Sequence, residues 1–175
     1  MKIAKWILIV VGILLTVFFV GAALMPSAYK VERSILINAP AEKIYPLIAT
    51  PREWTKWAIW FEREHDMKVS YAGAESGAGA KWEWRAKEGS GNMEFTRADP
   101  NKSVDYALAF PEMGMKSTGA LTLTPSGNAT RVSWTNEGDV GRNPMMRWFV
   151  PFLDGMIGKD YEDGLKKLKA MVEKG

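Results

Sequence analysis

The order of apolar and polar residues divides the chain into an apolar start, a middle of alternating residues and a long helical end. From Trp6 to Met25 only two glycines and one threonine interrupt the apolar residues. A run of about 20 apolar residues is long enough to cross a hydrocarbon core as a helix. We therefore predict a transmembrane helix over residues 6–25, within an N-terminal membrane anchor over residues 1–28 and ahead of one domain over residues 29–175.

A cleaved signal peptide is the alternative explanation of the same apolar run. Lys2 and Lys5 would form its positively charged start, and Val20 and Ala22 satisfy a small-residue cleavage rule. We favour a retained anchor, because the apolar run is longer than the usual core of a signal peptide and no A-x-A motif follows it.

Basic residues on either side of the span bear on its orientation. Lys2, Lys5 and the terminal amine favour a cytoplasmic N-terminus, whereas Lys30 and Arg33 beyond the span weaken this bias. We therefore expect a single-pass membrane protein whose domain lies on the outer side, either periplasmic or extracellular.

Between residues 67 and 137, apolar and polar residues alternate in short segments separated by turn residues, which predicts an antiparallel meander, and residues 29–37 alternate as one earlier strand. Strands are expected over residues 29–37, 67–72, 80–87, 93–98, 104–110, 116–124 and 130–137. Two short helices are expected after the first strand, one beginning at Pro40 and one after Pro51, since proline suits the first turn of a helix. Pro46 should kink or shorten the first of them.

The last stretch, residues 143–174, predicts one long amphipathic helix with Asn143 as its N-cap. Its apolar face has the spacing of three and four residues typical of a helix and contains Phe149, Leu153, Met156, Ile157, Tyr161, Leu165, Leu168 and Val172. Gly158 and Gly164 would let the sheet approach this helix closely. The sequence therefore predicts an α+β fold, in which a curved antiparallel sheet wraps around a long C-terminal helix and one transmembrane helix precedes both.

Composition and charge narrow the classes of function. The formal net charge is +3, and Lys2 and Lys5 in the anchor supply two of these charges, so the domain lacks the basic face that nucleic-acid binding requires. The absence of cysteine excludes disulfides, thiolate metal sites and a cysteine nucleophile. Eight tryptophans suit a large core, a membrane interface or an aromatic-lined pocket.

Several motifs occur along the domain in a fixed order. They are VERSILINAPAEKI over residues 31–44, the pairs Trp54/Trp57 and Trp82/Trp84, TRVSW over residues 130–134, GDVGRNP over residues 138–144 and IGKDYEDGLKKLK over residues 157–169. In this order the chain resembles the START-like (SRPBCC) superfamily, in its polyketide cyclase/dehydrase and lipid-transport branch. The resemblance implies a helix-grip fold whose sheet and long helix enclose an apolar cavity for lipids, sterols, polyketides or hormones. Because members range from lipid carriers to cyclases, the resemblance implies a fold more strongly than an activity.

Side-chain alternation along the strands selects the residues that would face the long helix and line such a cavity. The predicted ligand-binding residues are Trp82, Trp84, Phe95, Tyr106, Leu108, Phe110, Leu121, Trp134, Met156 and Tyr161. The alternative is that these side chains simply fill a core, since aromatic residues on strands usually pack. We favour a pocket, because a sheet curled around one helix tends to leave space near the end of that helix.

No other group of residues in the sequence predicts a catalytic or metal site, and we expect neither a metal nor a cofactor. His65, the single histidine, lies in an acidic loop without the further ligands that a metal needs. Glu83, Arg85 and Glu94 are expected as an exposed charged ladder across neighbouring strands. With the opposite alternation, Glu83 or Glu94 would be a buried general base with a raised pKa.

Three hypotheses of function follow from these patterns. The first, which we favour, is a membrane-anchored domain that binds a hydrophobic or amphipathic, lipid-like small molecule without catalysis. The second is a cyclase- or hydrolase-type enzyme that uses a cavity carboxylate, Glu83 or Glu94, together with Tyr106. The third is a partner-binding module of an envelope assembly, with a filled core and no pocket. The patterns assign no oligomeric state.

Overall fold

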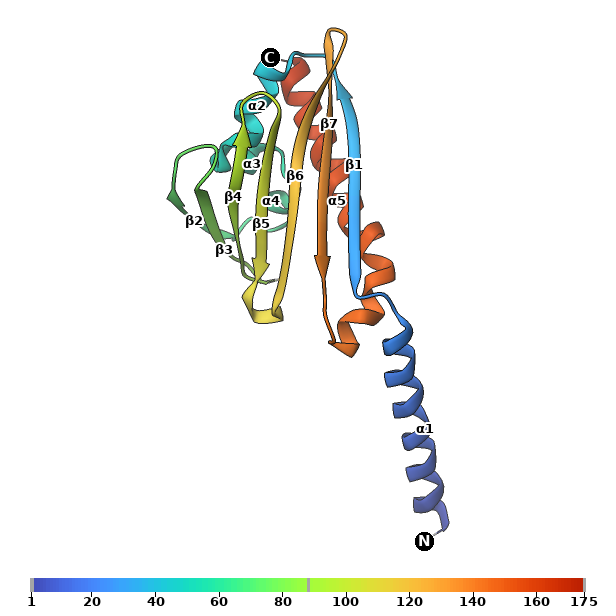
Figure 1. Cartoon of the computed structure of the whole chain (residues 1–175). Coiled ribbons are helices and arrows are strands. Elements are labelled where there is room, and N and C mark those ends of the chain that lie inside the picture. The colour runs from blue at the N-terminus through green and yellow to red at the C-terminus, as the bar shows by residue number, and fades with distance from the viewer. Residues whose placement is uncertain (1, 88, 175) are drawn as a thin grey trace.

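The computed structural model describes residues 2–87 and 89–174, and these form one sheet with helices packed on one of its faces (Figure 1). The helices are α1 (Lys2–Leu24), α2 (Ala41–Ala49), α3 (Pro51–Trp57), α4 (Trp60–Arg63), the single 3₁₀ turn η1 (Pro111–Met113) and α5 (Pro144–Lys174). The strands are β1 (Ala28–Ile37), β2 (Lys68–Gly73), β3 (Ala80–Arg85), β4 (Gly91–Asp99), β5 (Ser103–Phe110), β6 (Met115–Ser126) and β7 (Ala129–Asp139). Every strand and the long final helix lie where the alternation and the helical spacing predict them.

The sheet has the strand order β1-β7-β6-β5-β4-β3-β2, and all neighbouring strands are antiparallel. The strands from β2 to β7 form the predicted meander, whereas β1 closes the far edge by pairing with β7. In Figure 1 the curved sheet wraps around α5, which confirms the predicted α+β helix-grip fold. Residues 25–27 alone connect α1 to β1, so α1 projects directly from one end of the sheet.

One end of the domain faces α1, and we call it the anchor end. Figure 1 shows that the β5–β6 connection with η1 and the β7–α5 loop both lie there. At this end Asn143 caps α5, because its Oδ1 accepts hydrogen bonds from the backbone N–H groups of Met145 and Met146 at 3.1 and 3.2 Å. The predicted N-cap is therefore confirmed.

Two prolines lie inside helices without ending them. The helix α2 continues three residues past Pro46, and α5 runs through Pro151. Both prolines are exposed on the surface of their helices. Pro46 therefore leaves α2 as a helix of nine residues, and the chain turns into α3 only at Thr50.

Arg33 on β1 fastens the sheet to α5. Its Nε donates to Glu162 at 2.9 Å, and its two Nη atoms donate to the carboxylate of Asp154 at 2.9 and 3.1 Å. The hydrogen bond from Arg33 lowers the pKa of Asp154. Gly158 makes room for this arrangement, since a Cβ at that position would lie 2.1 Å from an Nη atom of Arg33. At Gly164 the same Cβ would make only ordinary contacts with Trp134 and Trp57, so close approach is required at Gly158.

We predict unequal effects for two glycine substitutions in α5. Gly155→Ala adds a methyl group in open space and should raise the free energy of unfolding by up to about 1 kcal/mol, the helix-propensity difference. Gly158→Ala should raise it less, because its methyl group displaces the guanidinium of Arg33 and weakens the two partly exposed ion pairs, each worth at most about 1 kcal/mol. Urea unfolding of the detergent-solubilised full chain measures both changes. Equal stabilisation by the two alanines would contradict the role given to Arg33.

Candidate ligand site

Aromatic side chains of α3 and of the strands fill much of the interior between the sheet and α5. The Trp54 ring is central, with its centroid 4.7 Å from that of Trp57, 5.4 Å from Trp82, 5.7 Å from Phe95 and 5.5 Å from Trp134. The indole N–H groups of Trp54 and Trp57 donate to the carbonyl groups of residues 48 and 47 at the end of α2, which would otherwise lack helical partners. These contacts place α3 firmly between the sheet and α5.

The predicted ligand-binding residues separate into three groups. Six are buried together in or beside this aromatic cluster: Trp82, Phe95, Tyr106, Leu121, Trp134 and Tyr161. Three on the same face of the sheet are partly exposed: Trp84, Leu108 and Phe110. Met156 is 63% exposed on α5 and does not join either group. The alternation along the strands thus identifies the inner face correctly, while the rings on that face largely pack against one another.

A cluster of neutral polar groups lies on the same inner face. The hydroxyl of Tyr106 donates to the carbonyl of Thr135 at 2.9 Å and accepts the indole N–H of Trp134 at 3.0 Å. Because the single proton of Tyr106 is used in this way, the hydroxyl of Tyr161 at 3.1 Å must donate to it. The Tyr161 ring stacks on Trp134 with centroids 3.8 Å apart, so hydrogen bonding and stacking act on the same pair of rings.

The polar cluster continues toward the anchor end. The Nδ2 of Asn136 donates to the hydroxyl of Ser117 at 3.1 Å, and Tyr29 shares a hydrogen bond with the same serine. Ser117 is the sheet partner of Leu108, so these polar groups adjoin the partly exposed apolar residues. Tyr29, Ser117 and Asn136 are not among the predicted ligand-binding residues, although Ser117 and Asn136 have the same alternation as Leu121 and Trp134 and were detectable on that ground.

Burial keeps the phenols of this cluster neutral. Desolvation raises the pKa of Tyr106, and it raises the pKa of Tyr161 well above 10.0, with the hydrogen bond that Tyr161 donates to Tyr106 adding to the effect. Within residues 2–87 and 89–174, no buried side-chain nitrogen or oxygen lacks a hydrogen-bond partner. The cluster is therefore a set of uncharged donors and acceptors in an apolar surrounding.

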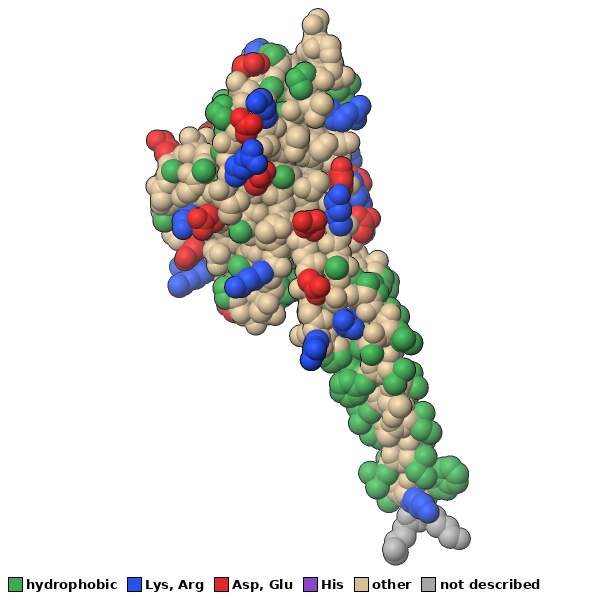
Figure 2. Space-filling view, in the orientation of Figure 1, with side chains coloured by type: hydrophobic (Ala, Val, Ile, Leu, Met, Phe, Trp, Pro, Cys, Tyr) green, Lys and Arg blue, Asp and Glu red, His purple; other side chains and the backbone are tan. Residues whose placement is uncertain are grey.

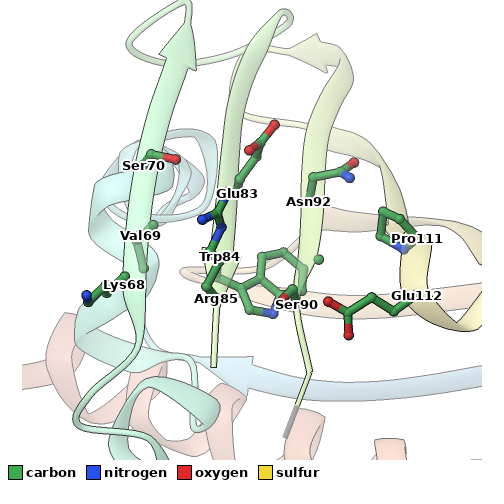
Figure 3. A pocket seen from close by; sticks show the side chains of 11 residues that line it. Lys68, Val69, Ser70, Glu83, Trp84, Arg85, Ser90, Asn92, Pro111 and Glu112 are labelled. Carbon is green, nitrogen blue, oxygen red and sulfur yellow. The ribbon is translucent and has the colours of Figure 1, made fainter. Parts of the chain in front are cut away.

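A hollow of about 420 Å³ opens at the anchor end beside Trp84 (Figure 3). The Trp84 ring extends from β3 over Gly91 of β4, where a Cβ would lie 2.3 Å from the ring, and it meets Phe110 edge-on at 5.7 Å between centroids. Polar side chains on the outward face of β2, β3 and β4 line it, among them the cross-strand neighbours Ser70, Glu83 and Asn92. Trp84 is thus the one predicted ligand-binding residue that lines this hollow.

The acidic candidates lie on the outward face of the sheet. Glu83 and Arg85 are exposed as predicted, whereas Glu94 forms its ion pair with Lys81, at 3.0 Å across β3 and β4, and not with Arg85. His65 is exposed in the loop before β2, as expected. In the part of the chain that the structure describes, no three histidine, aspartate or glutamate side chains gather in a way that would hold a metal ion.

We predict unequal costs for removing the two phenolic hydroxyls. Tyr106→Phe leaves the buried indole N–H of Trp134 without its acceptor and should lower the free energy of unfolding by about 1–3 kcal/mol. Tyr161→Phe removes only a donor to Tyr106 and should cost about 1 kcal/mol or less. Thermal or urea unfolding of the two variants, which are matched in size and chemistry, tests the donor assignment. A larger loss for Tyr161→Phe would reverse it.

Comparison with solved structures finds the same fold in proteins of low sequence identity. Protein CV1439 from Chromobacterium violaceum is 18% identical, with a TM-score of 0.60 over 83% of this chain and 98% of that chain. The Aha1 dimer from Colwellia psychrerythraea is 23% identical, with a TM-score of 0.59 over 82% of this chain and 96% of that chain. The di-domain ARO/CYC StfQ from the steffimycin biosynthetic pathway is 13% identical, with a TM-score of 0.63 over 84% of this chain and 52% of that chain. At these identities the likeness shows the fold alone.

Sequence comparison identifies the family. No curated protein matches the chain. A family model described as polyketide cyclase / dehydrase and lipid transport matches residues 28–173, which is most of the chain and all seven strands. The protein therefore belongs to the polyketide cyclase/dehydrase and lipid transport family of the START-like superfamily.

Proposed function

We propose that this protein is a membrane-anchored domain that binds a hydrophobic or amphipathic, lipid-like small molecule between its sheet and α5, without catalysis. The family makes residues 28–173 a ligand-binding domain of the polyketide cyclase/dehydrase type. The proposal adds where the ligand lies, what its chemistry is and how the domain is attached.

The observation that carries the proposal is the composition of the inner face at the anchor end. Trp84, Leu108 and Phe110 are partly exposed there, and each square ångström of such apolar surface that a ligand covers stabilises the complex by about 25 cal/mol. Next to them, Ser117 and Asn136 are buried, uncharged groups that hydrogen-bond to each other. Apolar walls with a few neutral polar groups suit a molecule with a hydrocarbon body and a hydroxyl or carbonyl group.

The position of the acidic side chains favours binding over chemistry. A cyclase- or hydrolase-type mechanism through a cavity carboxylate would need Glu83 or Glu94 to face inward, whereas both lie on the outward face. In the described residues, the buried polar side chains apart from tyrosine and tryptophan are Ser117, Thr130 and Asn136, none of which titrates near neutral pH.

A second candidate function is a partner-binding module with no pocket, and the packing of the interior favours it. Trp54, Trp82 and Trp134 occupy much of the space that the family resemblance assigns to a cavity. The two candidates predict different results for the purified protein, since only a ligand-binding domain releases a bound small molecule when it is denatured.

The apolar helix α1 supports the anchoring part of the proposal. Within residues Ile3–Leu24, the most apolar window of 18 residues has a mean hydropathy of 3.0, and the domain buries only 6% of it. A helix of this length and exposure suits a hydrocarbon core better than water. We further propose that Lys2 and Lys5 keep the N-terminus in the cytoplasm, which places the domain on the outer side.

We predict that the detergent-extracted full chain releases an apolar small molecule on denaturation, identified by mass spectrometry. Leu108→Trp places a large ring on the partly exposed inner face and should reduce the amount released about tenfold, a loss of about 1.4 kcal/mol in binding. Glu94→Ala, on the outward face of β4 and away from the hollow beside Trp84, should leave the amount unchanged. Circular dichroism confirms that both variants are folded. Absence of any molecule from the wild-type chain would favour the partner-binding module.

We also predict that α1 is retained in the mature protein and that the domain is outside. The mass of the membrane-extracted protein should include residues 2–25. In intact spheroplasts, an impermeant maleimide should label Ser126→Cys at the exposed end of β6 and leave Ile3→Cys unlabelled, which is testable because the natural chain has no cysteine. A mass that lacks the first residues would identify a signal peptide, and the reverse labelling would invert the orientation.

A further inference from the structure

The first half of α5 carries an apolar stripe that the domain does not cover. Met145, Phe149, Phe152 and Met156 lie four, three and four residues apart, which places them on one face of the helix. Each of the four is between 50% and 65% exposed. The stripe extends over about 16 Å at the helical rise of 1.5 Å per residue. Large apolar residues that gather in this way on a protein surface mark a contact with something apolar.

The same face of α5 becomes charged farther from the anchor end. Continuing at helical spacing, the next residues are Lys159, Asp163 and Lys166, and Asp163 is ion-paired with Lys159 at 2.5 Å and with Lys166 at 3.3 Å. One helical face thus changes from apolar to charged between Met156 and Lys159. A change of this kind along a single face is expected where a helix leaves an apolar medium and enters water.

The stripe begins where α5 contacts α1. The Trp148 ring stacks on Phe18 with centroids 6.2 Å apart, and it lies against Gly21, where a Cβ would be 2.5 Å from the ring. Arg147 donates to the carbonyl groups of Ala22 and Ala23 at 3.4 and 3.2 Å. The last turn of α1 and the first turns of α5 are therefore packed side by side. Figure 2 shows that hydrophobic side chains continue from the projecting helix onto the adjoining part of the domain.

The contact with α1 identifies the medium that covers the stripe. Arg147 occupies the carbonyl groups at the C-terminal end of α1, which a helix leaves without internal partners, so the position of α5 is fixed relative to the end of the span. A segment held at the point where a transmembrane helix ends lies at the level of the lipid headgroups. An amphipathic helix at that level buries its apolar face in the boundary between headgroups and acyl chains.

We propose that the apolar stripe of Met145, Phe149, Phe152 and Met156 inserts into the lipid surface beside α1, so that α5 rests the domain on the bilayer. This inference goes beyond the proposed ligand binding and rests only on its anchoring part. In this arrangement α5 contacts the sheet on one side and lipid on another. The contact with lipid lies at the anchor end, where Trp84 and Phe110 also lie.

The test uses single cysteines in the otherwise cysteine-free full chain, each labelled with a fluorophore whose emission spin-labelled phospholipids quench. The label at Phe152→Cys reports the stripe, and the label at Lys166→Cys reports the charged part of the same face. The label at Leu14→Cys reports the span itself. The proteins are reconstituted into vesicles of phosphatidylethanolamine and phosphatidylglycerol, with and without spin-labelled phospholipid.

We expect the label at position 152 to lose about half of its fluorescence to the spin-labelled lipid, as a group at the acyl boundary would, and the label at position 166 to lose little. Quenching at position 14 without quenching at position 152 would overturn the inference and leave the anchoring intact. An unquenched label at position 14 would instead overturn the anchoring. A label at position 152 that is shielded from lipid and self-quenches in proportion to the protein density would show a second copy on the stripe, and that result also overturns the inference.

Discussion

The stacking of Tyr161 on Trp134 is the contact on which the arrangement of sheet and helix depends. The two rings are nearly parallel, with 3° between their planes, and their polar atoms meet at one hydroxyl, that of Tyr106. An aromatic pair contributes about 0.5–1.5 kcal/mol beyond the area that it buries. Since Tyr106, Trp134 and Tyr161 come from β5, β7 and α5, this group fixes the distance between two strands and the helix at once.

The consequence is an interior of two unlike halves. On one side of the Tyr106 hydroxyl, tryptophan rings pack closely around Trp54 and leave the helix little freedom. On the other side, toward the anchor end, Trp84, Leu108 and Phe110 keep part of their surface exposed. This division suits a binding protein. The closely packed half maintains the fold, while the partly exposed half can contact a ligand without rearrangement of the core.

Prediction from the sequence was most accurate on strands that have one buried face and one solvent-exposed face. Alternation placed Trp82, Phe95 and Trp134 on the inner face, since on the strands of this sheet every second side chain points into the core. It did not indicate how full that face is, because ring packing depends on where α3 brings Trp54 and Trp57. Small polar residues such as Ser117 and Asn136 were also missed, as their types alone suggest turns or surface positions.

The first half of α5 shows a different reason for incomplete prediction. Met156 has the spacing of the apolar face that includes Tyr161, yet it is exposed, because residues 145–156 are apolar on two sides of the helix. Helical periodicity assumes one apolar and one aqueous surrounding. Where a helix contacts both a protein core and a second apolar surface, periodicity cannot distinguish the two. The contacts of Trp148 with α1 supply the missing information.

The connection between α1 and β1 limits how far such a domain can travel. Three residues at about 3.3–3.6 Å each allow roughly 10 Å of separation, which is less than the height of the domain itself. With α1 in a bilayer, this connection is too short for the domain to carry a bound molecule from one membrane to another. The molecule would instead be exchanged at the leaflet next to the domain, and its transfer to a second membrane would need a separate, freely diffusing acceptor.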